Sequence, residues 1–165
     1  MILYWGDGNF MFDSVNLKSV NKSYGVKQAL KNINLNIESG KIVGLLGPNG
    51  SGKTTMIKLI VGLIKPSSGI VTIDGQEPGK VTKSYVSYLP DKDFLDINMS
   101  IEDTIRMFAG FYADFDIGIA YKLLEDLQVP YKFKIKALSK GNREKLMLIL
   151  VMSRRAKLYV LDEPI

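Results

Sequence analysis

The feature that most constrains this chain is a glycine-rich octapeptide, Gly47-Pro48-Asn49-Gly50-Ser51-Gly52-Lys53-Thr54. It satisfies the pattern G-x-x-x-x-G-K-[ST], and it stands between an apolar stretch, residues 42–46, and a segment with apolar residues at helical spacing. In this context the small residues let backbone N–H groups curl around phosphates, and the following helix points its positive N-terminal end at them. The sequence therefore predicts a phosphate-binding loop between a buried strand and a helix.

Two side chains of this loop are suited to bind a nucleotide and its metal ion. Lys53 supplies a positive charge for the β- and γ-phosphates, and the Thr54 hydroxyl offers an oxygen ligand to Mg²⁺. The alternative is a glycine-rich turn that happens to precede a lysine. The apolar stretch before the loop and the helical pattern after it favour the phosphate-binding interpretation.

A pair of carboxylates, Asp162 and Glu163, follows the apolar stretch at residues 158–161. Ligand sites of parallel sheets lie beyond the carboxyl ends of the strands, so we expect this pair to meet the phosphate loop. One carboxylate would hold Mg²⁺ through water, and the other would polarise an attacking water molecule. The alternative is a solvated acidic pair at the end of a strand.

Periodicity along the chain predicts an α/β fold with a parallel core. Alternating apolar residues predict two half-buried strands before the loop, and later apolar stretches predict strands separated by helices. Ser100 and Asp103 form the pattern of a capping box at the start of one helix. The predicted strands cover residues 15–20, 33–37, 42–46, 70–73, 85–89 and 158–161, and the predicted helices cover residues 57–64, 100–111, 116–127 and 142–155.

Composition excludes several kinds of site. The chain of 165 residues suits one domain, and without cysteine or histidine it has no disulfide, catalytic thiol or imidazole. No apolar stretch approaches the ~18 residues that span a bilayer. Residues 1–12 lack the basic start of a signal peptide, so we expect an edge strand or an upstream extension there and a cytoplasmic protein.

The net charge of +5 is distributed unevenly along the chain. Residues 132–157 contain nine basic residues and one acidic residue, whereas residues 91–126 contain nine acidic and three basic residues. Ordinary solvated helix faces would explain both segments. The functional alternative is that one surface faces phosphates and the other faces a protein partner.

Taken together, these motifs make residues 15–165 resemble the ATP-binding cassette of an ABC transporter. A phosphate loop alone indicates only a P-loop NTPase, and the specific signal is the order of the further motifs. After the phosphate loop these are Lys65-Pro66-Ser67-Ser68-Gly69, Ile73-Asp74-Gly75, Leu138-Ser139-Lys140-Gly141-Asn142 and Leu161-Asp162-Glu163-Pro164.

The resemblance implies the fold and the activity. The expected fold is one P-loop NTPase domain over residues 1–165, with a parallel core sheet, an N-terminal antiparallel β subdomain and an inserted helical subdomain at about residues 92–155. The expected activity is ATP binding and hydrolysis that powers a membrane transporter through dimerisation of two cassettes. The implied partners are an identical or different second cassette and a transmembrane permease, which would hold the chain at the inner face of the cell membrane. No nucleic-acid partner is expected.

The resemblance also implies roles for particular residues. Tyr24 matches the aromatic residue that stacks on adenine, and Glu163 matches the catalytic base. Ser139 and Gly141 would face the γ-phosphate bound by the partner cassette. Mg²⁺ would be held by Thr54, Asp91 and Asp162, and the remaining ATP contacts would come from Gly47, Pro48, Asn49, Gly50, Ser51, Gly52, Lys53 and Thr55.

Three departures from the family pattern stand out. Lys140 and Asn142 replace the usual glycine and glutamine, and Asp91 stands where the family has a glutamine. The chain also has no switch histidine and no segment after Ile165, so we expect a truncated cassette lacking the C-terminal part of its core. Such a chain would have a gap beside the phosphate-loop strand and little ATPase activity alone. The alternatives are a soluble ABC ATPase without a transport role and a catalytically incompetent nucleotide-binding fragment.

Overall fold

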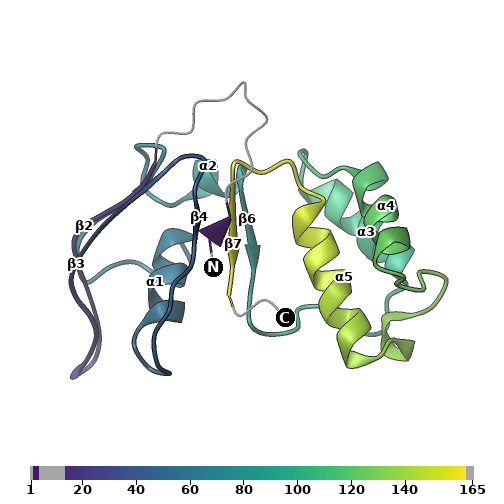
Figure 1. Ribbon diagram of the computed structural model, residues 1–165, viewed down its shortest axis with the longest axis horizontal. Coiled ribbons are helices and arrows are strands. Elements are labelled where there is room, and N and C mark those ends of the chain that lie inside the picture. Colours follow the sequence, from purple (N-terminus) through teal and green to yellow (C-terminus); the bar gives the residue numbers. More distant parts are fainter. Residues whose placement is uncertain (1, 4–13, 163–165) are drawn as a thin grey trace.

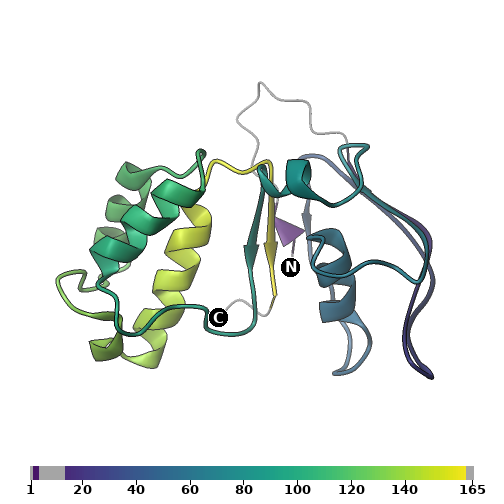
Figure 2. The same ribbon diagram turned by 180° about the vertical axis from the view of Figure 1, so that it is seen from behind.

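Sheets and helices alternate across the molecule in successive layers (Figure 1). This structure is a computed structural model that describes residues 2–3 and 14–162. An antiparallel sheet stands at one side, helix α1 (Lys53–Ile60) lies between it and a central sheet, and further helices lie beyond that sheet. The view from behind shows the same order of layers (Figure 2). The chain therefore has the mixed α/β architecture of a P-loop NTPase, as predicted.

The antiparallel sheet has the order β3-β2-β5. Its strands are β2 (Ser14–Tyr24), β3 (Lys27–Glu38) and β5 (Ser68–Ile73). Val15, Leu17 and Val20 are at most 2% exposed, and they pack toward α1 in one core. The period-two pattern thus identified the two longer strands, because alternate residues of a strand point to opposite faces.

The central sheet sets the position of the functional site. Its order is β4-β1-β7-β6, with strands β4 (Ile42–Val43), β1 (Ile2–Leu3), β7 (Leu158–Leu161) and β6 (Val86–Leu89). Strands β6 and β7 are parallel, whereas β1 is antiparallel to both β4 and β7. It follows that β4, β6 and β7 run in one direction, so their carboxyl ends lie at the same edge of the sheet.

Strand β1 corrects two expectations. Ile2 pairs with Val43 on one side and with Val160 on the other, so the expected gap beside the phosphate-loop strand is filled among the described residues. Residues 2–3 also lie inside the sheet and not at its edge. The driving force is hydrogen bonding, because unpaired strand N–H and C=O groups are costly when they are buried. The rest of the predicted N-terminal segment lies outside the described residues.

Strand β4 is shorter and more exposed than predicted. It covers only Ile42–Val43, and Ile42 is 72% exposed while Leu46 is 96% exposed. The reason is that β4 is the edge strand among the described residues, with β1 as its neighbour, so its apolar residues are not covered on both faces. Val43 and Leu45 pack partly against the core shared with α1.

Most of the other helices form a group on the side of the central sheet away from α1 (Figure 2). Ser100 accepts a hydrogen bond from the Asp103 backbone N–H at 3.1 Å, and Asp116 caps the next helix through its side chain. The predicted capping at Ser100 is thus confirmed. The helices of this group are α3 (Ile101–Phe111), α4 (Ile117–Asp126), the short 3-10 helix η1 (Ile135–Ala137) and α5 (Lys140–Met152). The short helix α2 (Lys80–Lys83) lies apart from them, on the α1 side of β6 and β7 (Figure 1). None of the helices in the described part of the chain is both long and apolar enough to cross a membrane.

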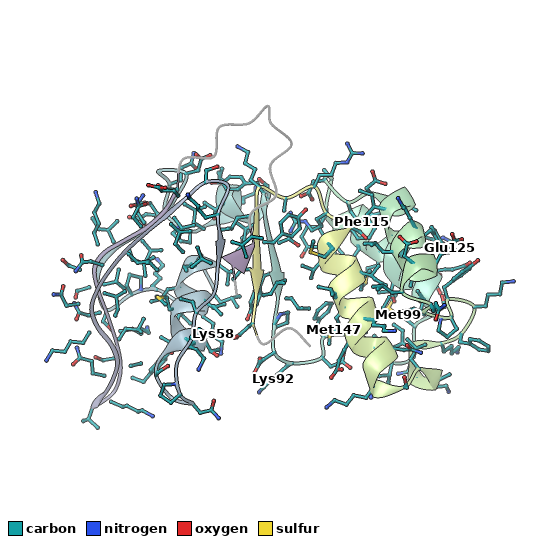
Figure 3. All side chains as sticks on the ribbon, viewed as in Figure 1. Lys58, Lys92, Met99, Phe115, Glu125 and Met147 are labelled. Atoms are coloured by element: carbon teal, nitrogen blue, oxygen red, sulfur yellow. The ribbon has the colours of Figure 1, made fainter. Side chains whose placement is uncertain are left out.

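Helices α3, α4 and α5 share a core of their own. Ile101, Leu124 and Leu146 are fully buried within it. On the other face of α5, Met147 points toward the central strands (Figure 3) and packs with Leu89 of β6. The division into a helical subdomain at about residues 92–155 stays a prediction.

A buried arginine joins this group of helices to the central sheet. Arg154 is 5% exposed and forms an ion pair with Asp114, with its Nε 2.9 Å from Oδ1. Its guanidinium also donates to the Val86 carbonyl at 2.8 Å and to the Ser84 carbonyl at 3.0 Å. One side chain thus connects the end of α5, the α3–α4 connection and the start of β6.

The role of β1 can be tested with proline, which cannot donate a backbone hydrogen bond. We expect Ile2→Pro/Leu3→Pro to lower the melting temperature by about 5 °C, since it removes bonds to both neighbouring strands. Ile2→Val/Leu3→Val keeps both N–H groups and is the matched control. Equal melting temperatures for the two double variants, measured by calorimetry, would show that β1 does not hold the sheet together.

Candidate functional site

The glycine-rich loop turns sharply into α1. Gly52 has a φ of +94°, and a Cβ atom there would lie 2.7 Å from Leu30 Cδ2 and 2.8 Å from the Ala29 carbonyl oxygen. Only glycine fits this conformation and this close approach to β3. Within the loop, the Ser51 N–H donates to the Pro48 carbonyl at 3.2 Å. The loop is therefore built against the antiparallel sheet, with α1 starting directly after Gly52.

The Lys53 ammonium lies inside the curve of its own loop. Its Nζ donates to the carbonyl oxygens of Gly47 at 2.7 Å and Pro48 at 3.0 Å. These two solvent-exposed hydrogen bonds place the positive charge of Lys53 at the N-terminal end of α1, where the helix dipole also favours anions. An incoming phosphate oxygen could accept from the same ammonium.

The Thr54 hydroxyl meets the carboxylate at the end of β7. Its Oγ1 donates to Asp162 Oδ1 at 3.4 Å, a contact between residues 108 positions apart in the sequence. Asp162 is only 2% exposed, and its backbone N–H donates to the Leu89 carbonyl at 2.9 Å. The structure thus brings the first predicted carboxylate to the phosphate loop. Glu163, the predicted base, lies outside the described residues.

A cavity of about 390 Å³ opens beside the loop. Tyr24, which is 49% exposed, contributes an aromatic ring, and Lys27, Gln28 and Ala29 of β3 complete that wall. The three β3 residues were missed in the sequence, although the turn at Gly25 would have placed them opposite Tyr24. The volume is within the ~300–1,000 Å³ typical of small-molecule sites. The loop side is lined by Asn49, Gly50, Gly52, Lys53, Thr54 and Thr55.

Ser139 and Gly141 do not line this cavity. Ser139 caps α5, accepting a hydrogen bond from the Asn142 N–H at 3.3 Å, and both residues are exposed. The starts of α1 and α5 lie at the same lower edge of the molecule in Figure 1, with the central strands between them. Within one chain, the two predicted phosphate-binding surfaces are therefore separate.

Tyr88 is a further residue of this edge, and no sequence motif marked it. Partial burial, together with the nearby negative charges of Asp162 and Asp91, raises the pKa of Tyr88 to about 12. The phenol therefore stays protonated at neutral pH and remains able to donate a hydrogen bond. Because the charges of both carboxylates raise the pKa of Tyr88, Asp91 and Asp162 make the potential negative at the carboxyl ends of β6 and β7.

The oxygen atoms at this edge fit Mg²⁺. Thr54 and Asp162 offer a hydroxyl and a carboxylate, the hard ligands that this ion prefers. No group of three or more histidine, cysteine, aspartate or glutamate side chains that could hold a metal occurs in residues 2–3 and 14–162. Mg²⁺ commonly takes one or two protein ligands and completes its shell with phosphates and water, so Thr54 and Asp162 could serve as its protein ligands.

Comparison with known proteins identifies the family. The family model described as ABC transporter matches residues 30–165. The chain belongs to the ABC transporter family. It is 38% identical over 156 residues to the zinc import ATP-binding protein ZnuC of Wigglesworthia glossinidia brevipalpis, a match that covers 93% of this chain and 63% of the relative. It is 35% identical over 152 residues to the ABC transporter ATP-binding protein YtrB of Bacillus subtilis, covering 91% of this chain and 52% of that one.

Solved structures of ABC proteins have the same fold. A putative ABC transporter ATP-binding protein from Pyrococcus furiosus superposes with a TM-score of 0.81 at 30% identity, covering 92% of this chain and 76% of that one. A dimeric ATP-binding cassette in a post-hydrolysis state, bound to ADP and Pi, superposes with a TM-score of 0.76 at 25% identity, covering 91% of this chain and 74% of that one. The chain thus spans about half to two thirds of the two curated relatives and about three quarters of these two structures.

The Thr54–Asp162 contact predicts a metal-dependent effect on nucleotide binding. Adding Mg²⁺ should raise the ATP affinity of the wild type. We expect this gain to be about tenfold smaller in Thr54→Val, which removes the hydroxyl but keeps the shape of the side chain. Titration calorimetry with and without Mg²⁺ measures this gain. Thr72→Val on β5 is the matched control away from the cavity. A gain equal to that of the wild type would exclude Thr54 as a metal ligand.

Proposed function

We propose that this chain is the ATP-binding and ATP-hydrolysing part of a membrane transporter. The single observation that carries the proposal is the contact of Thr54 with Asp162 beside the phosphate loop and cavity. That contact joins a phosphate-binding element to a metal-binding carboxylate, the combination that nucleotide hydrolysis requires. Membership of the ABC transporter family supports the same activity.

In this proposal each wall of the cavity takes one part of ATP. Tyr24 stacks on the adenine ring, while the backbone N–H groups of residues 47–54 and the Lys53 ammonium bind the phosphates. Lys53 exchanges its carbonyl partners for the β- and γ-phosphate oxygens. Thr54 and Asp162 would hold Mg²⁺, which would offset the charge of the phosphates, and Asp91 adds negative charge nearby.

Hydrolysis needs a residue to orient and polarise the attacking water. Glu163 follows Asp162 directly in the sequence, so we assign it this role as general base. Ser139 and Gly141 supply the remaining contacts to a γ-phosphate, but to the one bound by a second cassette. Their exposure and their separation from the cavity of their own chain support this arrangement.

Two partners follow from the proposal. A second cassette, identical or different, completes each site through its Ser139 and Gly141, and a transmembrane permease receives the motion of dimer closure. ZnuC and YtrB, two relatives of this chain, are named as ATP-binding proteins of transport systems, which supports this role. The permease would hold the chain at the cytoplasmic face of the membrane.

The assignment of the phosphate loop predicts the effect of removing its lysine. We expect Lys53→Ala to weaken ATP binding by at least about tenfold, because charge-assisted hydrogen bonds to the phosphates are lost. Lys58→Ala, in the same helix but outside the cavity lining, should bind ATP like the wild type. Calorimetric titration of the three folded proteins decides this, and unchanged affinity of Lys53→Ala would contradict the assignment.

The catalytic assignment predicts a separation of binding from hydrolysis. Glu163→Gln should bind ATP normally but release phosphate about a hundredfold more slowly, since an amide is a far weaker base. Glu125→Gln, on the exposed face of α4, is the control for the same chemical change. Single-turnover phosphate release with Mg-ATP measures the effect. A rate for Glu163→Gln close to that of Glu125→Gln would show that another group is the base.

A further inference from the structure

One face of the Tyr24 ring is covered by a cation. Lys22 and Tyr24 lie two positions apart on β2, where the pairing with β3 shifts register between Lys22 and Ser23. The Lys22 Nζ lies 5.2 Å from the centroid of the Tyr24 ring. This is within the ~6 Å over which an ammonium is attracted by the negative face of an aromatic ring.

The Lys22 ammonium is itself anchored. Its Nζ donates a hydrogen bond of 2.7 Å to the carbonyl oxygen of Lys65, which precedes β5. The neighbouring Ser67 is tied to the same end of β2, because its N–H donates to the Asn21 carbonyl at 2.8 Å. The Ser67 hydroxyl oxygen also accepts from the Ser23 N–H at 3.0 Å. The ammonium is therefore held by a rigid acceptor and does not depend on the Tyr24 ring alone for its position.

Lys22 contacts Tyr24 but does not reach the cavity lining itself. Tyr24 lines the cavity of about 390 Å³, whereas Lys22 does not. The ammonium thus contacts the Tyr24 ring without being part of the cavity lining. Tyr24 is 49% exposed and lines the cavity, so part of this residue remains open to a ligand there.

We propose that Lys22 is a positioning residue for Tyr24, fixing the ring so that its free face is presented to the base of the bound nucleotide. This inference rests on the proposed function, because it assigns the base-stacking role to Tyr24. Lys22 touches no ligand in this proposal. It acts by reducing the freedom that an exposed tyrosine would lose on stacking, which lowers the entropic cost of binding the base.

This role predicts that substituting Lys22 weakens the binding only of ligands that carry a base. Lys22→Met keeps a long unbranched side chain but removes its charge and its hydrogen bond to Lys65, so the ring is released while the phosphate loop is unchanged. We expect about threefold weaker binding of Mg-ATP and unchanged binding of inorganic tripolyphosphate, which has no base. Lys22→Arg restores a cation over the ring and should recover most of the ATP affinity. Lys18→Met, at an exposed position of the same strand, is the matched control.

Combining the substitution with one at Tyr24 separates positioning from general stabilisation. In a Tyr24→Leu background the ring is absent, so Lys22→Met should have no further effect on ATP affinity. Calorimetric titration of both ligands against the single and double variants measures the coupling. Melting temperatures of the same preparations report any loss of stability.

The outcomes distinguish this inference from the proposed function. The positioning role is wrong if Lys22→Met leaves ATP affinity unchanged, or if it weakens the binding of ATP and of tripolyphosphate equally. It is also wrong if Lys22→Met reduces ATP affinity as much in the Tyr24→Leu background as in the wild type. The adenine assignment would still stand if Tyr24→Leu alone weakened ATP selectively. If Tyr24→Leu weakens neither ligand, the base-stacking role of Tyr24 fails, and the role of Lys22 fails with it.

Discussion

The shared direction of two strands in the central sheet brings the two halves of the candidate site together. Strands β4 and β7 run the same way although β1 is paired between them, so the loop after β4 and Asp162 after β7 leave the sheet at one edge. This shared direction lets the Thr54 hydroxyl reach the Asp162 carboxylate at 3.4 Å. If either strand were reversed, the phosphate loop and the carboxylate would lie at opposite ends of the molecule.

Charge is segregated around this edge in a way that suits a metal–nucleotide complex. Lys53 and the N-terminal end of α1 contribute positive potential where phosphates would bind. Asp162 and Asp91 contribute negative potential nearby, which is also why the pKa of Tyr88 is raised beyond the effect of burial. In a complex of Mg²⁺ with a nucleotide, the phosphates would match the positive region and the metal ion would match the negative region.

The two ends of α5 differ in how they are held. Buried Arg154 ties the C-terminal end of α5 to β6 and to Asp114, whereas Ser139 at the other end is exposed. The helix is therefore anchored to the sheet at the end remote from Ser139. This leaves the Ser139 end on the surface, where a second protein molecule can reach it. Arg154 showed no motif in the sequence, because its importance comes from burial and from partners distant in the chain.

The sequence by itself determined the elements that rest on local patterns. These are the phosphate loop, the period-two strands β2 and β3, and the helix capped by Ser100, because each depends on the properties of neighbouring residues. Only the tertiary structure decided the rest: the place of Ile2–Leu3 between β4 and β7, the exposure of Ile42, the joining role of Arg154, and the contact of Lys22 with the Tyr24 ring. Each of these features depends on which strand or side chain becomes a neighbour in space, and local patterns of residues do not specify those long-range pairings.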